Sequence, residues 1–242
     1  RRPVAPAARV QEIPLHTPEM RGHGADSPAF GHRRRSRGIR RTLLFMRFGT
    51  LDFTAALASP ELLAAPTAAA IAAAVEAAKA AANEAADAPA AAGADDVLVS
   101  AIDPGLADTA AFCAQYEISM ADGANCVIVQ ARRGERTWYA ACLVRGSDRA
   151  DVNGVVRRHL DARKLSFAPM DDAVALTGME YGGITPIGLP ADWPILVDES
   201  VAGHERLIVG SGIRGSKLLV TGAFLASLPN AEVLPIAIVP AG

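Results

Sequence analysis

The strongest constraint on the fold is the grouping of apolar residues after Asp96 into short runs separated by helical stretches. Such runs, rich in Val, Ile and Leu and bounded by turn residues, predict β-strands. The strands do not alternate strictly with long helices, so the pattern favours an α+β domain on a mixed sheet over a doubly wound parallel one. Strands are expected at residues 97–102, 126–131, 137–144, 194–198, 207–210, 217–220 and 233–239, and helices at 107–115, 151–160, 171–177 and 223–228.

Two of these strands are expected to form a hairpin. The runs Cys126–Ala131 and Thr137–Val144 are joined by the short polar segment Arg132-Arg133-Gly134-Glu135. A glycine between two apolar strands supplies the backbone freedom that a tight turn requires. The two runs are therefore predicted to pair antiparallel.

The first 96 residues divide into two segments of different composition. Residues 1–45 are rich in Arg, Pro, Gly and His and lack a hydrophobic period, so they cannot offset the entropy of ordering. We interpret them either as a disordered basic tail or as upstream sequence translated through a misplaced start before Met46. Residues 46–96 hold an alanine-dominated helix, expected over 67–87, and are interpreted as an accessory arm without chemistry. Residues 97–242 then form the functional domain.

The charge distribution does not by itself indicate a nucleic-acid partner. The net charge is −2, but ten arginines and only three acids precede Met46, which leaves 14 basic and 23 acidic residues in the remainder. Attraction of a polyanion therefore depends on a local basic patch and not on the overall charge of the domain.

Cysteine usage and hydropathy indicate a cytoplasmic protein without a membrane partner. Cys113, Cys126 and Cys142 are odd in number, lie in apolar surroundings and lack a CxxC spacing. We expect them to be reduced, buried side chains with no metal or disulfide role. No apolar run approaches the roughly 18 residues that a membrane span requires.

The glycine-rich segment Gly210-Ser211-Gly212-Ile213-Arg214-Gly215 fits the pattern GxGxxG after an apolar run. A dinucleotide-binding motif of this kind should open a helix within a βαβ series. Here residues 216–220 are β-like and little chain remains, so that interpretation is disfavoured. Successive glycines beside an arginine still expose N–H groups to a phosphate or carboxylate, although a tight turn alone would explain them.

A second glycine-rich segment, residues 182–188, reads Gly-Gly-Ile-Thr-Pro-Ile-Gly. Its paired glycines permit positive φ, Pro186 sets the chain direction, and Thr185 offers a hydroxyl and a backbone N–H. A simple turn needs only one glycine. The composition therefore suggests the wall of a binding site, with an ordinary loop as the alternative.

Three motifs in a fixed order resemble a known family. Residues 178–188 read Gly-Met-Glu-Tyr-Gly-Gly-Ile-Thr-Pro-Ile-Gly, residues 194–198 form an aliphatic run ending in aspartate, and residues 209–215 lead into an Arg-Gly turn. This order resembles the YbaK/ProX family, which is also found as the editing insertion of bacterial prolyl-tRNA synthetases. The resemblance spans roughly residues 103–234. It implies an α+β fold with a mixed, largely antiparallel sheet curled toward a barrel, with flanking helices.

The resemblance implies an aminoacyl-tRNA deacylase that acts in trans, without a metal or nucleotide cofactor. Its partners would be the tRNA acceptor end with a small, wrongly attached amino acid and an aminoacyl-tRNA synthetase. Such a site needs a small pocket, donors for the developing oxyanion and contacts to phosphates. The residues implied for substrate binding are Gly182, Gly183, Ile184, Thr185, Pro186 and Gly188 in one loop, and Gly210, Ser211, Gly212 and Arg214 in the other.

Two departures from the family pattern concern charge. Many members carry a lysine important for deacylation where this chain has Asn125, and some carry an aspartate where it has Lys217. Lys217 either supplies the missing charge from the other side of the pocket or is an ordinary solvated strand residue. Asn125 and Lys217 are thus the candidate catalytic residues. The alternative function is a binding module for tRNA or another nucleotide that has lost hydrolysis.

Overall fold

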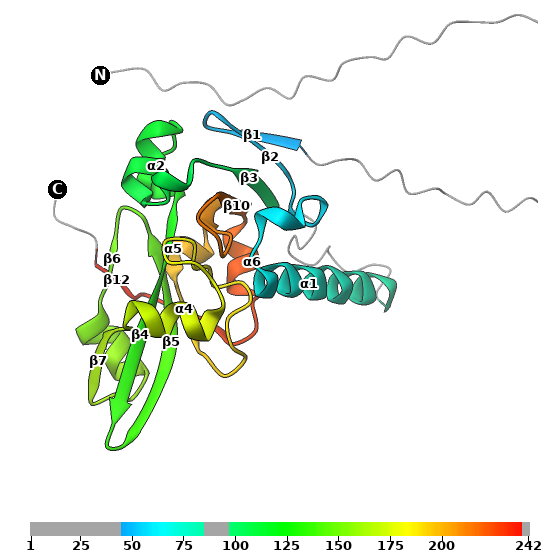
Figure 1. The fold of residues 1–242 in the computed structure, drawn as a ribbon. Coiled ribbons are helices and arrows are strands. Elements are labelled where there is room, and N and C mark those ends of the chain that lie inside the picture. Colours follow the sequence, from blue (N-terminus) through cyan, green and yellow to red (C-terminus); the bar gives the residue numbers. More distant parts are fainter. Residues whose placement is uncertain (1–44, 85–96, 239–242) are drawn as a thin grey trace, which may run out of the picture. The chain divides into compact units, whose positions relative to one another are not determined.

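The computed structural model describes residues 45–84 and 97–238, whose strands form two five-stranded sheets and a two-stranded pair (Figure 1). The first sheet has the order β1-β2-β3-β10-β9 and is antiparallel throughout. It is built from β1 (Phe45–Phe48), β2 (Leu51–Ala55), β3 (Leu98–Ala101), β9 (Leu207–Gly210) and β10 (Ser216–Val220).

The second sheet is mixed and has the order β11-β8-β5-β4-β7. Strand β8 is parallel to both of its neighbours, and the other two pairings are antiparallel. The α+β class with a mixed, largely antiparallel arrangement is therefore confirmed. The strands are β4 (Ala124–Arg133), β5 (Arg136–Arg145), β7 (Lys164–Phe167), β8 (Ile195–Asp198) and β11 (Ala231–Leu234), and the separate pair is β6 (Arg149–Ala150) with β12 (Ala237–Ile238).

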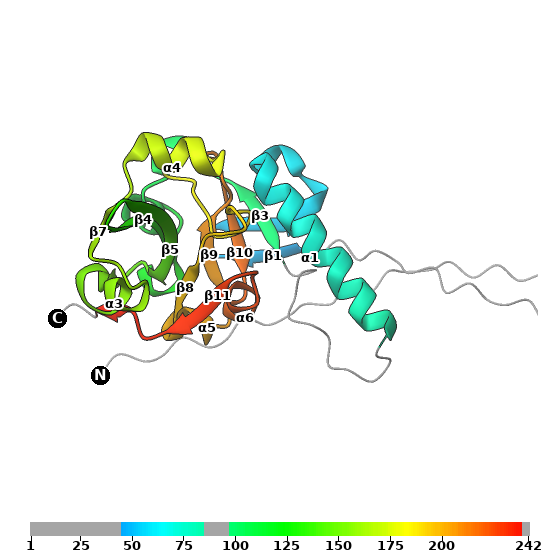
Figure 2. The ribbon, with the colours of Figure 1, turned by 90° about the horizontal axis from the view of Figure 1, so that it is seen from below.

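The expected curling of one sheet toward a barrel is not confirmed, because no closed barrel is found in the described part of the chain. The two sheets meet where β9 passes the start of β4, and a single parallel bridge joins Gly123 to Ile208. Further along, the same edge of β4 pairs with β7 instead, from Val129 to Arg132. Figure 2 shows β7, β4, β5 and β8 on one side and β9, β10, β3 and β1 on the other.

The helices are short apart from α1, which runs outward from the sheets (Figures 1 and 2). Within the described residues, no helix has both the length and the apolar character needed to cross a membrane. The helices are α1 (Ala65–Glu84), α2 (Thr109–Gln115), α3 (Arg157–His159), α4 (Met170–Thr177), α5 (Glu199–Ala202) and α6 (Gly222–Ala226), with 3-10 turns at Ala56–Ala58, Pro60–Leu62, Pro104–Leu106 and Met120–Asp122.

The predicted hairpin is confirmed as β4 and β5, which pair in register from Ala124 with Arg145 to Arg133 with Arg136. Its turn is tighter than the predicted four-residue segment, since only Gly134, at φ +61°, and Glu135 lie between the strands. Alternate residues of β5 enter different apolar clusters, with Leu143 in the main core and Cys142 in a second one. This central strand is therefore buried on both faces.

Two predicted elements are interrupted in the structure. The strand expected over residues 233–239 is divided into β11 and β12 at Pro235, which has no N–H to donate to a ladder. The helix expected over 151–160 begins as a π-helical turn, Val152–Val156, and continues as α3. The Asp151 carboxylate accepts hydrogen bonds from the N–H groups of Gly154 and Val155 at 2.9 Å and so caps the first turn.

The segment interpreted as an accessory arm contains more than a helix. Strands β1 and β2, which the sequence did not predict, join the first sheet, and β2 pairs with β3 across the expected boundary at residue 97. Helix α1 was expected to be an accessory element that buries little surface. However, Ile71 is only 1% exposed and lies with Val75 in the main core. The sequence did not reveal the core positions of Ile71 and Val75 because both stand within a long run of alanines. The domain boundaries themselves stay a prediction, and residues 1–44 lie outside the described part.

Candidate active site

A cavity of about 890 Å³ opens where the two sheets meet. Its wall comes from the segment around α2, the start of β4, the start of α4, the loop after α4, and the ends of β9 and β10. A volume of this order falls within the roughly 300–1,000 Å³ typical of small-molecule sites. Six of the twelve predicted site residues line it: Asn125, Gly182, Ile184, Gly210, Arg214 and Lys217.

Lys217 is the buried cation of this cavity, with only 7% of its surface exposed. It lies on β10 opposite Gly210 and Ser100, in the middle of the first sheet. Its Nζ donates to the carbonyl of Ala107 at 3.1 Å and lies 5.6 Å from the centre of the Phe112 ring. Of the two alternatives that the sequence left open, an ordinary solvated strand residue is therefore excluded for Lys217.

The charge state of Lys217 reflects its surroundings. Burial lowers the pKa of its ammonium from the ordinary 10.5, since desolvation disfavours the charged form. Cys113 and Asp108 act against that shift, whereas the charge of Arg214 adds to it.

Asn125 lies at the start of β4, opposite Val144 in the hairpin. Its Oδ1 accepts a hydrogen bond of 2.6 Å from the hydroxyl of Thr109, in the first turn of α2. With the oxygen engaged in this way, the amide nitrogen is left to donate elsewhere. The structure thus puts a neutral donor and a cation on the wall of one cavity, from strands of different sheets.

Arg214 fastens the turn after β9 to two neighbouring segments. Its guanidinium donates to the carbonyl of Tyr181 at 3.0 Å and to that of Pro104 at 3.1 Å. Its backbone N–H donates to the Glu180 carboxylate at 2.7 Å. The half-buried side chain adds positive charge at the cavity while holding the loop in place.

The two glycine-rich segments pack directly backbone to backbone. The N–H of Gly212 donates to the carbonyl of Gly183, and the N–H of Glu180 donates to the carbonyl of Gly212, both at 2.8 Å. A Cβ on Gly183 would lie 2.5 Å from the backbone of Ile213, and one on Gly210 would overlap the Gly183 carbonyl. Of the paired glycines, Gly182 has the positive φ, +84°, and Gly183 does not.

The other six predicted site residues do not line this cavity. Gly183 is covered by the turn at Ile213, and Gly188 and Gly212 press against the start of α1 near Pro66 and Ala64. Pro186 lines a separate apolar cavity of about 600 Å³ along α1, together with Gly188. The sequence did not reveal this division because both faces of the loops need residues of the same small types.

Ser211 and Thr185 are fully buried behind the loops. The Ser211 hydroxyl bonds to that of Ser216 at 2.7 Å, and the Ser216 hydroxyl in turn donates to the carbonyl of Leu62 at 2.5 Å. The N–H of Thr185 points to the sulfur of Met179 at 3.5 Å, and within the described residues its hydroxyl has no partner. Both residues therefore support the loops and do not face the cavity.

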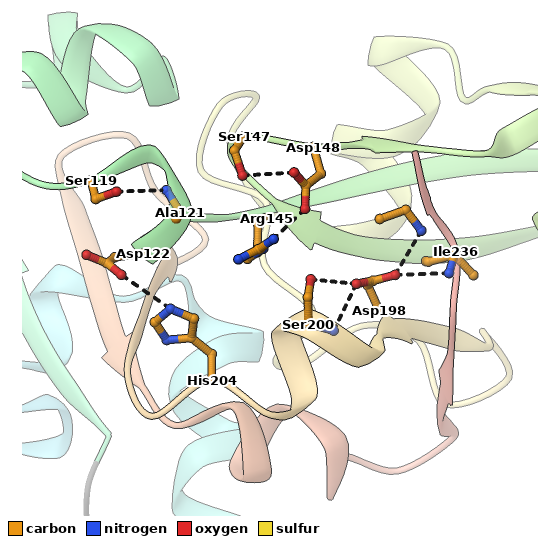
Figure 3. A network of polar contacts seen from close by, with 11 residues as sticks. Ser119, Ala121, Asp122, Arg145, Ser147, Asp148, Asp198, Ser200, His204 and Ile236 are labelled. Atoms are coloured by element: carbon orange, nitrogen blue, oxygen red, sulfur yellow. Dashed lines mark hydrogen bonds and ion pairs between the residues drawn. The ribbon is translucent and has the colours of Figure 1, made fainter. Parts of the chain in front are cut away.

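The GxGxxG-like turn is followed by strand β10 and not by a helix, as expected. The aspartate that ends the second motif, Asp198, also has a structural role. Its carboxylate accepts from the N–H and hydroxyl of Ser200 and from the N–H groups of Ile236 and Ala237 (Figure 3). It thereby caps α5 and holds the connection between β11 and β12.

Polar contacts hold the 3-10 turn Met120–Asp122, which lies next to the cavity. The Nε2 of His204 lies 3.2 Å from the carboxylate of Asp122, and the Ser119 hydroxyl accepts from the N–H of Ala121, in the turn that contains Met120 (Figure 3). Met120 and the adjacent Gly123 line the cavity. His204 thus contacts the turn that carries these two lining residues.

The three cysteines are free, and burial raises the pKa of each thiol, that of Cys142 to about 12. Their thiols therefore stay protonated near neutral pH. Cys126 lines the cavity, a placement that its apolar neighbours in the sequence did not suggest.

Several cavity residues were not predicted from the sequence. Thr109, Phe112, Phe167 and Tyr181 line the site, and the carbonyl of Ala107 holds Lys217. The one signal available was the N-cap pattern Asp108-Thr109, which locates a helix start. That pattern does not say which strand the helix start faces.

Comparison with known proteins identifies the family to which this chain belongs. Residues 103–228, more than half of the chain, match the family described as the aminoacyl-tRNA editing domain, and the chain belongs to this family, the YbaK family resembled by its sequence motifs.

Two curated relatives have related names. Over 72 residues the chain is 42% identical to a proline–tRNA ligase of Lactobacillus gasseri, a match covering 28% of this chain and 12% of the ligase. Over 99 residues it is 24% identical to EbsC of Enterococcus faecalis, a candidate Cys-tRNA(Pro)/Cys-tRNA(Cys) deacylase, covering 41% of this chain and 60% of that protein. The chain thus spans less than two thirds of either relative.

A solved structure described as a candidate trans-editing enzyme for prolyl-tRNA synthetase matches with a TM-score of 0.53 and 20% identity. The match covers 60% of this chain and 89% of that one. At this level of identity the likeness concerns the fold.

Proposed function

We propose that the chain hydrolyses the ester that joins a small, wrongly attached amino acid to the terminal adenosine of a tRNA. The observation that carries this proposal is a buried lysine on the wall of a cavity within the editing-domain region. The partners would be the charged tRNA acceptor end and an aminoacyl-tRNA synthetase, with the reaction in the cytoplasm and without a metal or nucleotide cofactor.

The reaction requires stabilisation of negative charge on the ester carbonyl oxygen. Water adds to the carbonyl carbon, and the tetrahedral intermediate collapses by breaking its bond to the ribose oxygen. The ribose oxygen takes a proton, and the amino acid leaves as a carboxylate after releasing its own proton to solvent. Lys217 and the amide of Asn125 are the donors proposed for the oxyanion, because both lie on the cavity wall.

The remaining substrate contacts fall into two groups. Gly182, Ile184, Gly210 and Arg214 line the cavity and would contact the substrate directly. We propose that Gly183, Thr185, Pro186, Gly188, Ser211 and Gly212 contribute by holding the two loops in register.

We further propose that residues 97–242 carry the chemistry and that residues 46–96 support the fold. The lining of the cavity begins at Gly105, and none of its described lining residues belongs to β1, β2 or α1. Residues 1–45 are proposed to be dispensable, whether as a basic tail or as upstream sequence.

The alternative function is a binding module for tRNA or another nucleotide that no longer hydrolyses the ester. The observation that favours it is that Lys217 and Asn125 already have protein partners, at Ala107 and Thr109. In addition, burial lowers the pKa of Lys217 and so weakens its hold on the proton.

A panel of mischarged tRNAs distinguishes the two functions. We expect the protein to release small amino acids such as cysteine or alanine, and Asn125→Lys not to reduce the rate, because it restores a charge at the family position. Lys79→Ala, in an exposed ion pair of α1, serves as the control. Tight tRNA binding without hydrolysis of any ester would favour the binding module.

A further inference from the structure

A second hollow, of about 740 Å³, lies on the second sheet beside β7. Four basic residues line it: Arg132, Arg157, Arg163 and Lys164. The polar residues Gln130, Asn153 and Ser166 also line it, and none of its lining residues in the described part of the chain is acidic. We call this hollow the basic groove.

The fold brings these four residues together from three segments. Lys164 of β7 lies opposite Arg132 of β4, and the N–H of Arg163 donates to the carbonyl of Arg132 at 2.9 Å. Arg157 follows the π-helical turn, and its Nε donates to the carbonyl of Asn153 at 3.0 Å. The groove is therefore built on paired strands and a capped turn, which hold its side chains near one another.

The charges of the basic groove are not neutralised within the described residues. None of the ion pairs recorded there involves its four cations, although the adjacent Arg133 pairs with Asp161. Arg132 instead donates to the neutral side chain of Gln130 at 2.6 Å. After residue 45 the chain has more acidic than basic residues. The basic groove is therefore a local concentration of positive charge, which favours a polyanionic ligand.

Phe167 connects the basic groove to the cavity, because it lines both. It ends β7 and is 67% exposed, so its ring is open to a planar ligand. An exposed aromatic ring beside a row of cations is the arrangement with which proteins bind single-stranded nucleic acid.

We infer that the basic groove binds the phosphates of the single-stranded 3′ end of the RNA, with a base stacked on Phe167. This inference rests on the proposed function, which puts the terminal aminoacyl adenosine in the adjoining cavity. The nucleotides before that adenosine then pass over Phe167 into the groove. Phosphate contacts of this kind position the strand without reading its sequence.

The test compares two double variants with equal changes in charge. Arg163→Glu/Lys164→Glu reverses two exposed charges of the groove, and Arg149→Glu/Arg158→Glu reverses two exposed arginines outside its lining. Each is measured for binding of uncharged tRNA over a range of salt, and for hydrolysis of a mischarged tRNA and of the same aminoacyl ester on adenosine alone.

The groove variant should raise the KM for mischarged tRNA and the Kd for uncharged tRNA roughly tenfold, and reduce the salt slope of binding by about two. Hydrolysis of aminoacyl-adenosine, which has no phosphate, should be unchanged. The control variant should shift affinity less than about twofold, and Phe167→Ala should weaken tRNA binding only when the tRNA has its single-stranded 3′ end.

The inference would be overturned if both double variants lost the same tRNA affinity. It would also be overturned if Phe167→Ala weakened the binding of tRNA with and without the single-stranded 3′ end equally. Absence of any hydrolysis by the unaltered protein would refute the deacylase and leave the binding comparison to decide on the groove. Normal hydrolysis of mischarged tRNA by the groove variant, with unchanged tRNA binding, would refute the role proposed for the groove and leave the proposed deacylase function standing.

Discussion

The two faces of the glycine-rich loops differ although their residue types are alike. On one face, Gly182 and Gly210 line the cavity that contains Lys217. On the other, Gly188 and Gly212 lie against the start of α1 and the residue before it, where an added Cβ would meet Pro66 or Ala64. The absence of a side chain permits close packing on both faces, but the neighbour differs: on the cavity face a Cβ on Gly210 would meet the Gly183 carbonyl of the other loop, and on the α1 face a Cβ on Gly188 would meet Pro66.

This difference predicts that changes on the two faces of the loops affect different properties of the protein. Shortening a side chain that lines the cavity, such as that of Lys217, should alter hydrolysis in a protein that still folds. Substitutions on the α1 face should alter folding and leave the activity of the folded molecules unchanged.

The largest effect is expected on the cavity face, from Lys217→Ala. Loss of one donor to an oxyanion typically lowers the rate about 10²- to 10³-fold, so kcat for a mischarged tRNA should fall by that amount. The circular dichroism spectrum should be retained, since burial of the lysine opposes its charged form. A kcat like that of the Lys79→Ala control would remove Lys217 from the mechanism.

Between the two faces, Gly183→Val should lower the free energy of unfolding. Its Cβ would lie 2.5 Å from the Ile213 backbone, which hydrogen bonds of the adjoining Gly212 hold against Gly183 and Glu180. Overpacking against a fixed backbone should cost about 3 kcal/mol, measured by urea unfolding. Gly215→Val is the control, because its nearest neighbour there is the Pro104 ring at 3.8 Å. A stable but inactive Gly183→Val protein would instead assign Gly183 to the binding surface.

On the α1 face, Gly188→Ala should cost about 2 kcal/mol of stability through backbone strain and overpacking. Gly188 has φ +91°, and its Cβ would lie 2.5 Å from the carbonyl oxygen of Pro66. Gly134→Ala, at φ +61° with no neighbour within 4 Å, isolates the strain alone and should cost about 1 kcal/mol. Equal losses in the two variants would show that contact with α1 contributes nothing.

A smaller effect is expected on the pH dependence of the free energy of unfolding, through Lys217 on the cavity face. Because the pKa of Lys217 is lower in the folded protein than the ordinary 10.5, the unfolded chain binds more protons between the two values. The stability contributed by this site therefore rises with pH through that window. Lys217→Met should be more stable than the unaltered protein near pH 7, by a margin that shrinks as the pH approaches 10.5. Cys113 is present in both chains, so its raised pKa largely cancels in the comparison. A margin independent of pH would contradict the shift.

The smallest effect is expected far from either face, from a chain that begins at Met46. Among the described residues this removes only Phe45, the first residue of β1, which is 63% exposed. The preceding sequence has no apolar period with which to dock, so the melting temperature and the deacylation rate should both be unchanged. A loss of several degrees or of most activity would show that the segment contributes.

Local pattern was enough to locate most strands and the central hairpin. The apolar runs of β4, β5, β8, β9 and β10 are bounded by turn residues, and each overlaps the predicted range. Pattern was insufficient for β1, β2 and β7, whose residues are largely polar or exposed in part. These strands form because a partner strand is available beside them, which is information that a single segment does not carry.

The sequence by itself determined the α+β class, the resemblance to an editing family, and the residue types of the site, including a lysine where some members have an aspartate. Only the tertiary structure decided which face each loop residue occupies. It put Lys217 beside Ala107 and Phe112, and Gly188 against α1. The physical reason is that side-chain direction and burial depend on contacts between segments far apart in the chain, and a glycine beside the cavity and a glycine packed against α1 are indistinguishable in the sequence.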